Sequence, residues 1–530
     1  MPNIKKILSI PFILALALIH ITVATGDQGT MPTKIALDGF DETTAARVEQ
    51  FVKRQMALHH SPGIAAGIVK GDKLVFAGYF GYADIDSARP VDEKTIFRIG
   101  SISKTMTTVG LMQQWEAGKF KLDDDANKYL PQPYMDPPHP ESAPITLRHL
   151  LTHTSGGGEL LSLRQLTRKW LGLVVEGDDY KPLEYYLDIG MKTKIDPGVK
   201  WAYSNFGFGY LGLALETIVG EPFHEYQKKN LFDRLGMKIT SYRHNDEILE
   251  NLVTGYQYEE GEYREAPHKA YGITSAGNVY TNIEEMALYV AAMLNGGAGR
   301  HGTVIKPETL SMVMKTHYTL DEKQNGWGLG FGVYGNDMWG HRVVGHSGSV
   351  PFGYTSMMLL VPEEKIGVFV FSNSWTYSPK PIGWGILKIV LGVNGEPLPE
   401  TQPKREIWPD LVGYYGPEHR DLKTDMRLLM KSVGKFRVAV VNDDLVLIHT
   451  WKGKDKARKL LQVAQDDPYF FMVADAKSPV PLYARFKKMG NGKMYLVHDG
   501  LNEYVKMGPV RKAKTVLAAP ICKHLSKLIP

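Results

Sequence analysis

Three stretches of the chain carry residue types that could do chemistry, and the first of them contains Ser101 and Lys104. They are three residues apart where a predicted helix begins, so they share one helix face and their side chains are adjacent. A serine hydroxyl is a weak nucleophile until a base takes its proton, and a desolvated lysine can be that base. The first turn of a helix also favours a developing anion. Taken alone, the pattern fits a serine N-cap followed by a surface lysine as well.

The second stretch, 201–210, places Tyr203 and Asn205 two residues apart with a small residue between them. In an extended or turning loop, both side chains would point the same way. A tyrosine can relay a proton, and an asparagine amide can hold a substrate carbonyl. An aromatic entry to a helix over 209–219 explains this stretch equally well.

The third stretch, 344–354, contains His346, Ser347, Gly348 and Ser349 and is predicted to lie at the edge of a strand set. Gly348 would let a ligand backbone approach, and the backbone N–H of Ser349 could donate to an oxyanion. Ser347 is a poor nucleophile candidate, because the Gly-x-Ser-x-Gly pattern fails at its last position.

One further pair, His149 and His153, has a spacing of four that could bind a metal. No third ligand or glutamate partner is near, so we interpret both as polar residues at the end of a short helix over 146–152. No metal and no other cofactor is expected.

The elements that must position these stretches follow from hydrophobic periodicity and turn residues. They are helices over 42–59, 101–117 and 381–391, a hairpin of 64–69 and 74–80, and strands over 355–360 and 367–373 joined by a turn at 363–365.

A proline-rich segment, 396–410, predicts a stiff linker after this first domain. Short alternating runs over 411–510, separated by turn residues, then predict a small antiparallel barrel or sandwich. The simplest role for this second domain is a lid or an oligomer contact. The basic tail, 511–530, could touch an anionic membrane, although a frayed terminus is the simpler interpretation.

The chain has 530 residues, which suggests two or three domains, and its 43% hydrophobic and 22% charged content is that of a globular protein. The net charge of +5 is too small to argue for nucleic-acid binding. A single cysteine, Cys522, excludes an intramolecular disulfide.

Two lysines before an apolar run predict a signal peptide over 1–24, with an uncleaved membrane anchor as the alternative interpretation. We therefore expect an exported protein, periplasmic or extracellular.

Taken in order, Ser-x-x-Lys, Tyr-Ser-Asn and His-Ser-Gly resemble the serine β-lactamase and penicillin-binding-protein superfamily, closest to its class C-like branch. The likeness covers roughly residues 40–395, and we place this domain at 34–395. It implies an α/β (α+β) fold, an antiparallel sheet flanked by helices with a helical subdomain. The start of the second domain, at 411–415, resembles the lipocalin-like domains appended to some relatives.

The resemblance also implies a role for each residue. Ser101 would be the acylated nucleophile, Lys104 its proton acceptor, and Tyr203 the base or proton shuttle, above all in deacylation. Asn205 would hold the substrate, and the N–H groups of Ser101 and Ser349 would form the oxyanion hole. The remaining substrate-binding positions would be His346, Ser347 and Gly348.

The chain departs from class C β-lactamases at His346-Ser347-Gly348, where they have Lys-Thr-Gly. A histidine with an unperturbed pKa is largely neutral near pH 7, whereas a lysine is charged. We therefore predict that Lys104 alone supplies the cation beside Tyr203, and that activity varies with pH as His346 titrates. Loss of the fixed charge also weakens binding of the carboxylate found in β-lactams and D-Ala-D-Ala peptides.

Three functions remain open at this point. The leading one is an exported serine hydrolase acting through an acyl-enzyme on small esters, amides or peptides. The second is a penicillin-binding D,D-peptidase or class C-like β-lactamase. The third is a catalytically silent binding or scaffold protein, against which the intact Ser101, Lys104 and Tyr203 argue. The expected partner is a small-molecule substrate, and a homo-oligomer is compatible with the sequence.

Overall fold

The computed structural model describes residues 31–507 except 158–173, 176, 189, 336–337, 352, 377, 394–398, 400, 418–435, 452–453, 476–479, 491 and 499. The predicted signal peptide and basic tail, and part of the predicted linker, lie outside the described residues. Among the helices that are described, none is long and apolar enough to cross a bilayer.

The first domain is built on an antiparallel sheet whose strands come from both ends of the domain. Its order is β1-β3-β2-β19-β18-β17-β16-β15, with β4 paired to β3. The strands are β1 (Thr33–Leu37), β2 (Gly63–Lys70), β3 (Lys73–Asp84), β4 (Arg89–Pro90), β15 (Gly326–Trp327), β16 (Gly332–Val333), β17 (Val344–Val350), β18 (Tyr354–Val361) and β19 (Ile366–Ser372). The predicted hairpin and strand set are confirmed, and β2 joins them by pairing with β19.

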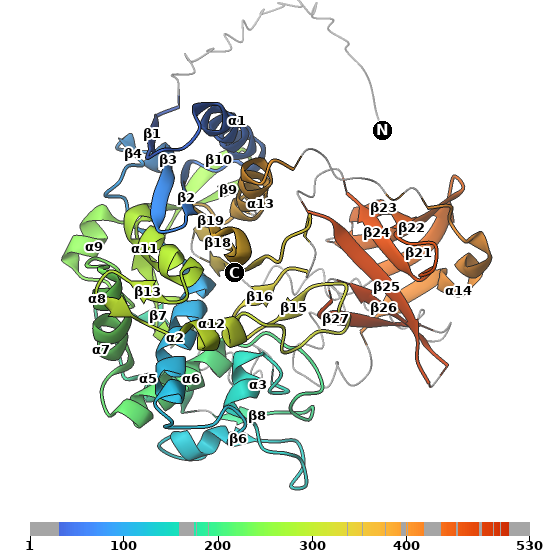
Figure 1. Cartoon of the computed structure of the whole chain (residues 1–530), viewed down its shortest axis with the longest axis horizontal. Coiled ribbons are helices and arrows are strands. Elements are labelled where there is room, and N and C mark those ends of the chain that lie inside the picture. Colours follow the sequence, from blue (N-terminus) through green and yellow to red (C-terminus); the bar gives the residue numbers. More distant parts are fainter. Residues whose placement is uncertain are drawn as a thin grey trace, which may run out of the picture. The chain divides into compact units, whose positions relative to one another are not determined.

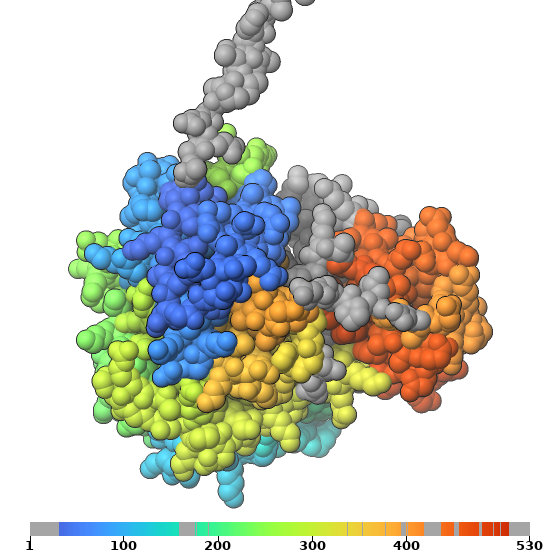
Figure 2. Space-filling view, turned by 45° about the horizontal axis from the view of Figure 1, so that its top comes forward, coloured from blue at the N-terminus to red at the C-terminus, as the bar shows by residue number. Residues whose placement is uncertain are grey.

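Helices cover this sheet on both faces (Figure 1). α1 (Glu42–His59) packs against α13 (Pro379–Val390), which lies on β18 and β19, while α11 (Ile283–Leu294) packs on β2 and β3. Figure 2 shows the blue N-terminal elements beside the orange segment that includes α13. α1 has the predicted bounds because its N-cap, Asp41, accepts a hydrogen bond from the Thr44 N–H, and its C-cap is left-handed.

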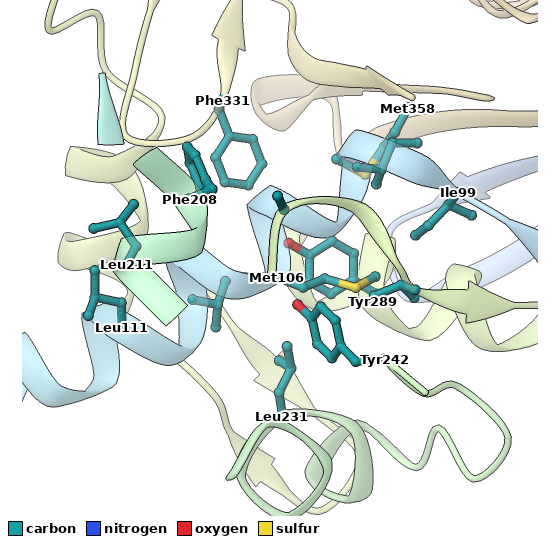
Figure 3. Packing of buried hydrophobic residues seen from close by; sticks show 14 of the residues in the cluster. Ile99, Met106, Leu111, Phe208, Leu211, Leu231, Tyr242, Tyr289, Phe331 and Met358 are labelled. Carbon is teal, nitrogen blue, oxygen red and sulfur yellow. The ribbon is translucent and has the colours of Figure 1, made fainter. Parts of the chain in front are cut away.

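The helical part of the domain is centred on α2 (Ser103–Glu116), which follows the 3₁₀ turn η1 (Gly100–Ile102). The first ten residues of α2 are all buried. α6 (Asn205–Val219), α10 (Thr274–Gly277) and α3 (Leu147–Leu151) lie nearby, with α6 and α10 packed directly on α2. In Figure 3, Met106 and Leu111 of α2 lie in one apolar cluster with Phe208 and Leu211 of α6. A polar group on the early turns of α2 is therefore held in a water-poor interior.

The remaining short elements complete the first domain. They are β5 (Phe97–Arg98), η2 (Ala126–Tyr129), β6 (Met135–Asp136), β7 (Val174–Val175), α5 (Leu183–Leu187), β8 (Met191–Lys192), α7 (Phe223–Gln227), η3 (Lys228–Phe232), α8 (Asp233–Leu235), α9 (Asp246–Asn251), β9 (Gly255–Glu259), β10 (Glu262–Ala266), β11 (Ala270–Tyr271), β12 (Tyr280–Thr281), β13 (Ala298–Gly299), β14 (Gly302–Thr303), α12 (Pro307–Val313) and η4 (Pro362–Glu364).

The second domain is a closed antiparallel barrel, which decides between the two predicted architectures. After η5 (Arg405–Ile407) and α14 (Trp408–Leu411), its strands are β20 (Gly413–Gly416), β21 (Phe436–Val441), β22 (Asp444–Trp451), β23 (Lys454–Gln462), β24 (Phe470–Ala474), β25 (Leu482–Lys488), β26 (Met494–His498) and β27 (Asn502–Lys506). It has its own hydrophobic core, separate from that of the first domain. The residue limits of the two domains stay predictions.

Candidate active site

Ser101 and Lys104 come together where η1 turns into α2. The Lys104 Nζ donates a hydrogen bond to the Ser101 Oγ over 3.1 Å. It also donates to the Asn205 Oδ1 over 2.6 Å and to the Ala276 carbonyl over 2.5 Å. The lysine is completely buried. Three acceptors thus hold the amine at the serine hydroxyl, which is the geometry needed for proton transfer between them.

Tyr203 and Asn205 reach the same amine from the start of α6. Ser204 is the N-cap, with an extended backbone and a side chain that accepts from the Gly207 N–H. This puts Tyr203 just before the helix and Asn205 in its first turn. The Lys104 Nζ lies 4.9 Å from the centroid of the Tyr203 ring. The prediction that both side chains point the same way is confirmed, although α6 begins at Asn205 and not at Gly209.

Gly348 brings the third stretch against the first. A Cβ on Gly348 would lie 2.0 Å from the Ile99 carbonyl oxygen and 2.2 Å from the Ser356 Oγ, so only glycine fits. The Ser356 Oγ donates to the same carbonyl over 2.7 Å. A Cβ on Gly100 would lie 2.8 Å from the Ser349 nitrogen. The backbone nitrogen of Ser349 is therefore beside the residue that precedes Ser101, as the predicted oxyanion hole requires.

Beyond Gly345, the edge of β17 that faces away from β18 pairs with no other strand that the structure describes. β17 pairs with β18 along its length, but with β16 only at Val344 and Gly345. Side chains alternate along the strand, so His346 is buried whereas Ser347 is exposed. The Ser349 Oγ accepts from the Trp375 indole over 3.1 Å. The structure thus brings His346 into the site, and it directs the Ser347 side chain to the other face of the strand.

His346 stays neutral in this position. Its Nδ1–H donates to the Ser347 carbonyl over 2.6 Å, which leaves Nε2 as the unprotonated nitrogen. Burial, followed by the nearby charge of Lys104, lowers the pKa of His346 to about 3. The expectation that activity would follow a His346 titration near neutral pH is therefore wrong. Burial lowers the pKa of the ring by more than its hydrogen bond to the Ser347 carbonyl raises it.

An aromatic wall around Tyr203 was not predicted. It consists of His153, Trp201 and Trp327, which touch one another and Tyr203 with ring centroids 4.3 to 6.2 Å apart. His346 approaches Tyr203 and Trp327 at 6.2 and 5.4 Å. Trp201 lies two residues before Tyr203, and His153 belongs to the His149 and His153 pair, but neither pattern predicts a contact with Tyr203. The wall makes one side of the site apolar, with neutral rings facing Tyr203.

Trp327 is carried by a loop that also contacts the barrel. The backbone of Trp327 pairs with that of Tyr318, which closes the loop. Within it, the Leu320 N–H donates to the Gly500 carbonyl over 2.8 Å. Asp321 forms an ion pair with Arg485 of β25, and both side chains are mostly buried. The barrel therefore holds the loop that ends at the active-site wall.

His149 has a structural contact of its own. It is the third residue of a capping box in which the Thr146 N–H donates to its Nδ1 and the Thr146 hydroxyl accepts from its N–H. Within the described part of the chain, no three histidine, cysteine, aspartate or glutamate residues form a cluster able to hold a metal.

Together, the fold and the site place Ser101 and Lys104, where η1 turns into α2, against Tyr203, which lies just before α6. The family model described as "Beta-lactamase" matches residues 48–388, well over half of the chain. The chain belongs to this family, and its mixed helix and strand domain has the β-lactamase/transpeptidase fold.

Relatives include Protein flp of Staphylococcus aureus (strain MRSA252), 24% identical over 344 residues, which are 63% of this chain and 64% of that protein. Penicillin-binding protein 4* of Bacillus subtilis (strain 168) is 25% identical, over 57% of this chain and 66% of its own length. The chain thus spans slightly less than two thirds of each. A solved octameric penicillin-binding protein homologue from Pyrococcus abyssi is 27% identical, with a TM-score of 0.57, and covers 87% of this chain and 100% of its own.

Proposed function

We propose that this protein is an exported serine hydrolase that forms an acyl-enzyme on Ser101 and acts on small esters, or on amides and peptides, without a carboxylate at the recognition end. The observation that carries the proposal is the 3.1 Å contact between the Lys104 Nζ and the Ser101 Oγ. Membership of a family of serine hydrolases supports the reaction class.

The residues support a two-step mechanism. The Ser101 Oγ attacks the substrate carbonyl while Lys104, in its unprotonated form, takes the hydroxyl proton, and the N–H groups of Ser101 and Ser349 stabilise the oxyanion. The C–O or C–N bond then breaks, and Tyr203 passes a proton to the leaving group. In the second step water attacks the acyl-enzyme, Tyr203 takes a proton from it, and Ser101 leaves with a proton returned through Lys104.

The preference for uncharged substrates rests on His346. A neutral ring replaces the cation that would bind a carboxylate, and the aromatic wall of His153, Trp201 and Trp327 adds apolar contact surface. Transfer of a carboxylate to such a surface without a charged partner is costly. Esters and neutral amides fit this chemistry better than β-lactams do.

A second candidate is a penicillin-binding D,D-peptidase or β-lactamase, which the names of the relatives from Bacillus subtilis and Pyrococcus abyssi favour. The octameric relative also supports a homo-oligomer, which light scattering coupled to gel filtration would reveal. Export is proposed from the N-terminal sequence alone, and sequencing the N-terminus of the protein made in cells tests it.

A substrate panel separates the two candidates. It contains p-nitrophenyl esters, D- and L-amino-acid anilides, and nitrocefin. We expect ester turnover well above nitrocefin turnover, and loss of turnover in Ser101→Ala but not in the surface control Ser87→Ala. Efficient nitrocefin hydrolysis or stable labelling by a fluorescent penicillin would favour the second candidate. Full activity of Ser101→Ala would refute both.

A further inference from the structure

His153 holds the chain on both sides of Tyr203. Its backbone carbonyl accepts a hydrogen bond from the Ala202 N–H over 2.7 Å. Its ring Nδ1 accepts from the Ser204 N–H over 3.1 Å. The ring itself lies against the Tyr203 ring, with centroids 4.3 Å apart. One residue therefore fixes the residue before Tyr203, the residue after it, and the face of its side chain.

The local backbone of His153 is unusual in a way that serves this contact. α3 ends at Leu151 with Thr152 as its C-cap, and His153 then adopts a left-handed conformation with φ +57°. This conformation is uncommon outside glycine, and asparagine, aspartate and histidine tolerate it best. It turns the carbonyl towards Ala202 while the side chain reaches Ser204. The side chain is completely buried, between Tyr203 and Phe208.

The hydrogen bonds fix the tautomer of the ring. A backbone N–H can only donate, so Nδ1 of His153 carries the lone pair and the neutral ring has its proton on Nε2. Protonation of Nδ1 would replace this acceptor with a donor facing the Ser204 N–H. Only the neutral ring can therefore hold the strand before α6 in its present place.

We propose that His153 is a positioning residue for Tyr203, acting through the acceptor at Nδ1 and through ring contact, and that it keeps the phenol ring beside Lys104. This inference rests on the proposed function, because its readout is the acyl-enzyme chemistry in which Tyr203 takes part. A displacement of about 1 Å in such a group is enough to cost roughly 10²-fold in rate.

Two amide variants separate the two ring nitrogens. Asparagine places its Oδ1 near the position of Nδ1 and tolerates the left-handed backbone. Glutamine places its amide near Nε2 and leaves the Ser204 N–H without its acceptor. For ester turnover we expect His153→Asn to keep kcat within about threefold of wild type, and His153→Gln to lose 10- to 100-fold, with similar KM. If the glutamine variant fails to fold, His153→Ala replaces it. The alanine variant also lacks the acceptor for the Ser204 N–H and should show the same loss of kcat relative to wild type.

A double-mutant cycle with Tyr203→Phe tests the route of the effect. If His153 acts through the Tyr203 hydroxyl, the glutamine substitution should lower kcat strongly in the wild type and less than threefold in Tyr203→Phe. Equal losses in both backgrounds, or a glutamine variant more active than the asparagine variant, would overturn the proposal. A wild type that turns over no substrate would instead refute the proposed function, so the two failures are distinguishable.

Discussion

The neutral state of His346 predicts how the protein responds to acid. Its pKa falls from the ordinary 6.5 to about 3 in the folded protein. Below pH 6.5, His346 therefore binds a proton in the unfolded chain but not in the folded chain. The free energy of unfolding falls as the pH is lowered. Between pH 7 and pH 5 the loss from this one histidine is about 2 kcal/mol, and it continues down to about pH 3.

Urea unfolding at pH 7, 6 and 5 measures this loss directly. The variant His346→Asn keeps a donor near the position of Nδ1 but has no ionisable group, so its stability should fall by about 2 kcal/mol less than that of wild type over this range. Other buried histidines remain in both proteins and cancel in the difference. His301→Asn, at an exposed position, controls for the loss of a histidine as such.

The neutral state of His346 also predicts how kcat depends on pH. Because His346 is neutral from pH 5 to pH 8, the kcat profile should contain no inflection from it in this range. Two results would refute the reasoning. One is an unfolding free energy with the same pH dependence in wild type and His346→Asn. The other is an inflection near pH 6 to 7 that disappears in the variant.

Two further substitutions test the geometry. Gly348→Ala should lower kcat for ester turnover by about 10²-fold or more, because its Cβ would lie 2.0 Å from the Ile99 carbonyl oxygen and would push an oxyanion donor away. Arg485→Met should lower the free energy of unfolding, measured in urea, by about 3 kcal/mol, because it leaves Asp321 buried without its partner and also removes an ion pair with Asp467. The same change should raise KM, because the loop of Asp321 ends at Trp327.

Each of these has a matched control. A Cβ on Gly490 meets nothing within 4 Å, so Gly490→Ala should leave kcat unchanged. An unchanged kcat in Gly348→Ala would mean that the strand does not supply the donor. The double variant Asp321→Leu with Arg485→Met should recover part of the lost stability. A double variant less stable than either single one would contradict a buried ion pair at this position.

Elements with a clean periodicity could be predicted from the sequence. α1 has the predicted bounds, and the predicted hairpin of 64–69 and 74–80 lies within β2 and β3. The barrel strands are harder to predict one by one: β23, Lys454–Gln462, is rich in charged residues and so lacks the apolar alternation by which strands are recognised. β27, Asn502–Lys506, is short and polar for the same reason.

The residues of the candidate site also fall into two groups, those that the sequence predicts and those that only the fold reveals. The sequence predicts four of the site residues, because each lies in a short motif whose spacing brings two reactive side chains together: Ser101, Lys104, Tyr203 and Asn205. Trp327 could not be predicted, because it comes from a distant loop and only the folded sheet brings it near Tyr203. His153 was interpreted as a polar helix end, since sequence spacing shows neither its left-handed backbone nor its contacts with residues 202 and 204.

The central claim is that the Ser101 hydroxyl, activated by Lys104, carries the acyl group. The most direct measurement is intact-mass and peptide-level mass spectrometry of the protein quenched in acid during turnover of a slow p-nitrophenyl ester. We predict a single acyl group on the peptide that contains Ser101, longer-lived in Tyr203→Phe and missing in Ser101→Ala. An acyl group on another residue, or ester turnover by Ser101→Ala at the wild-type rate, would contradict it.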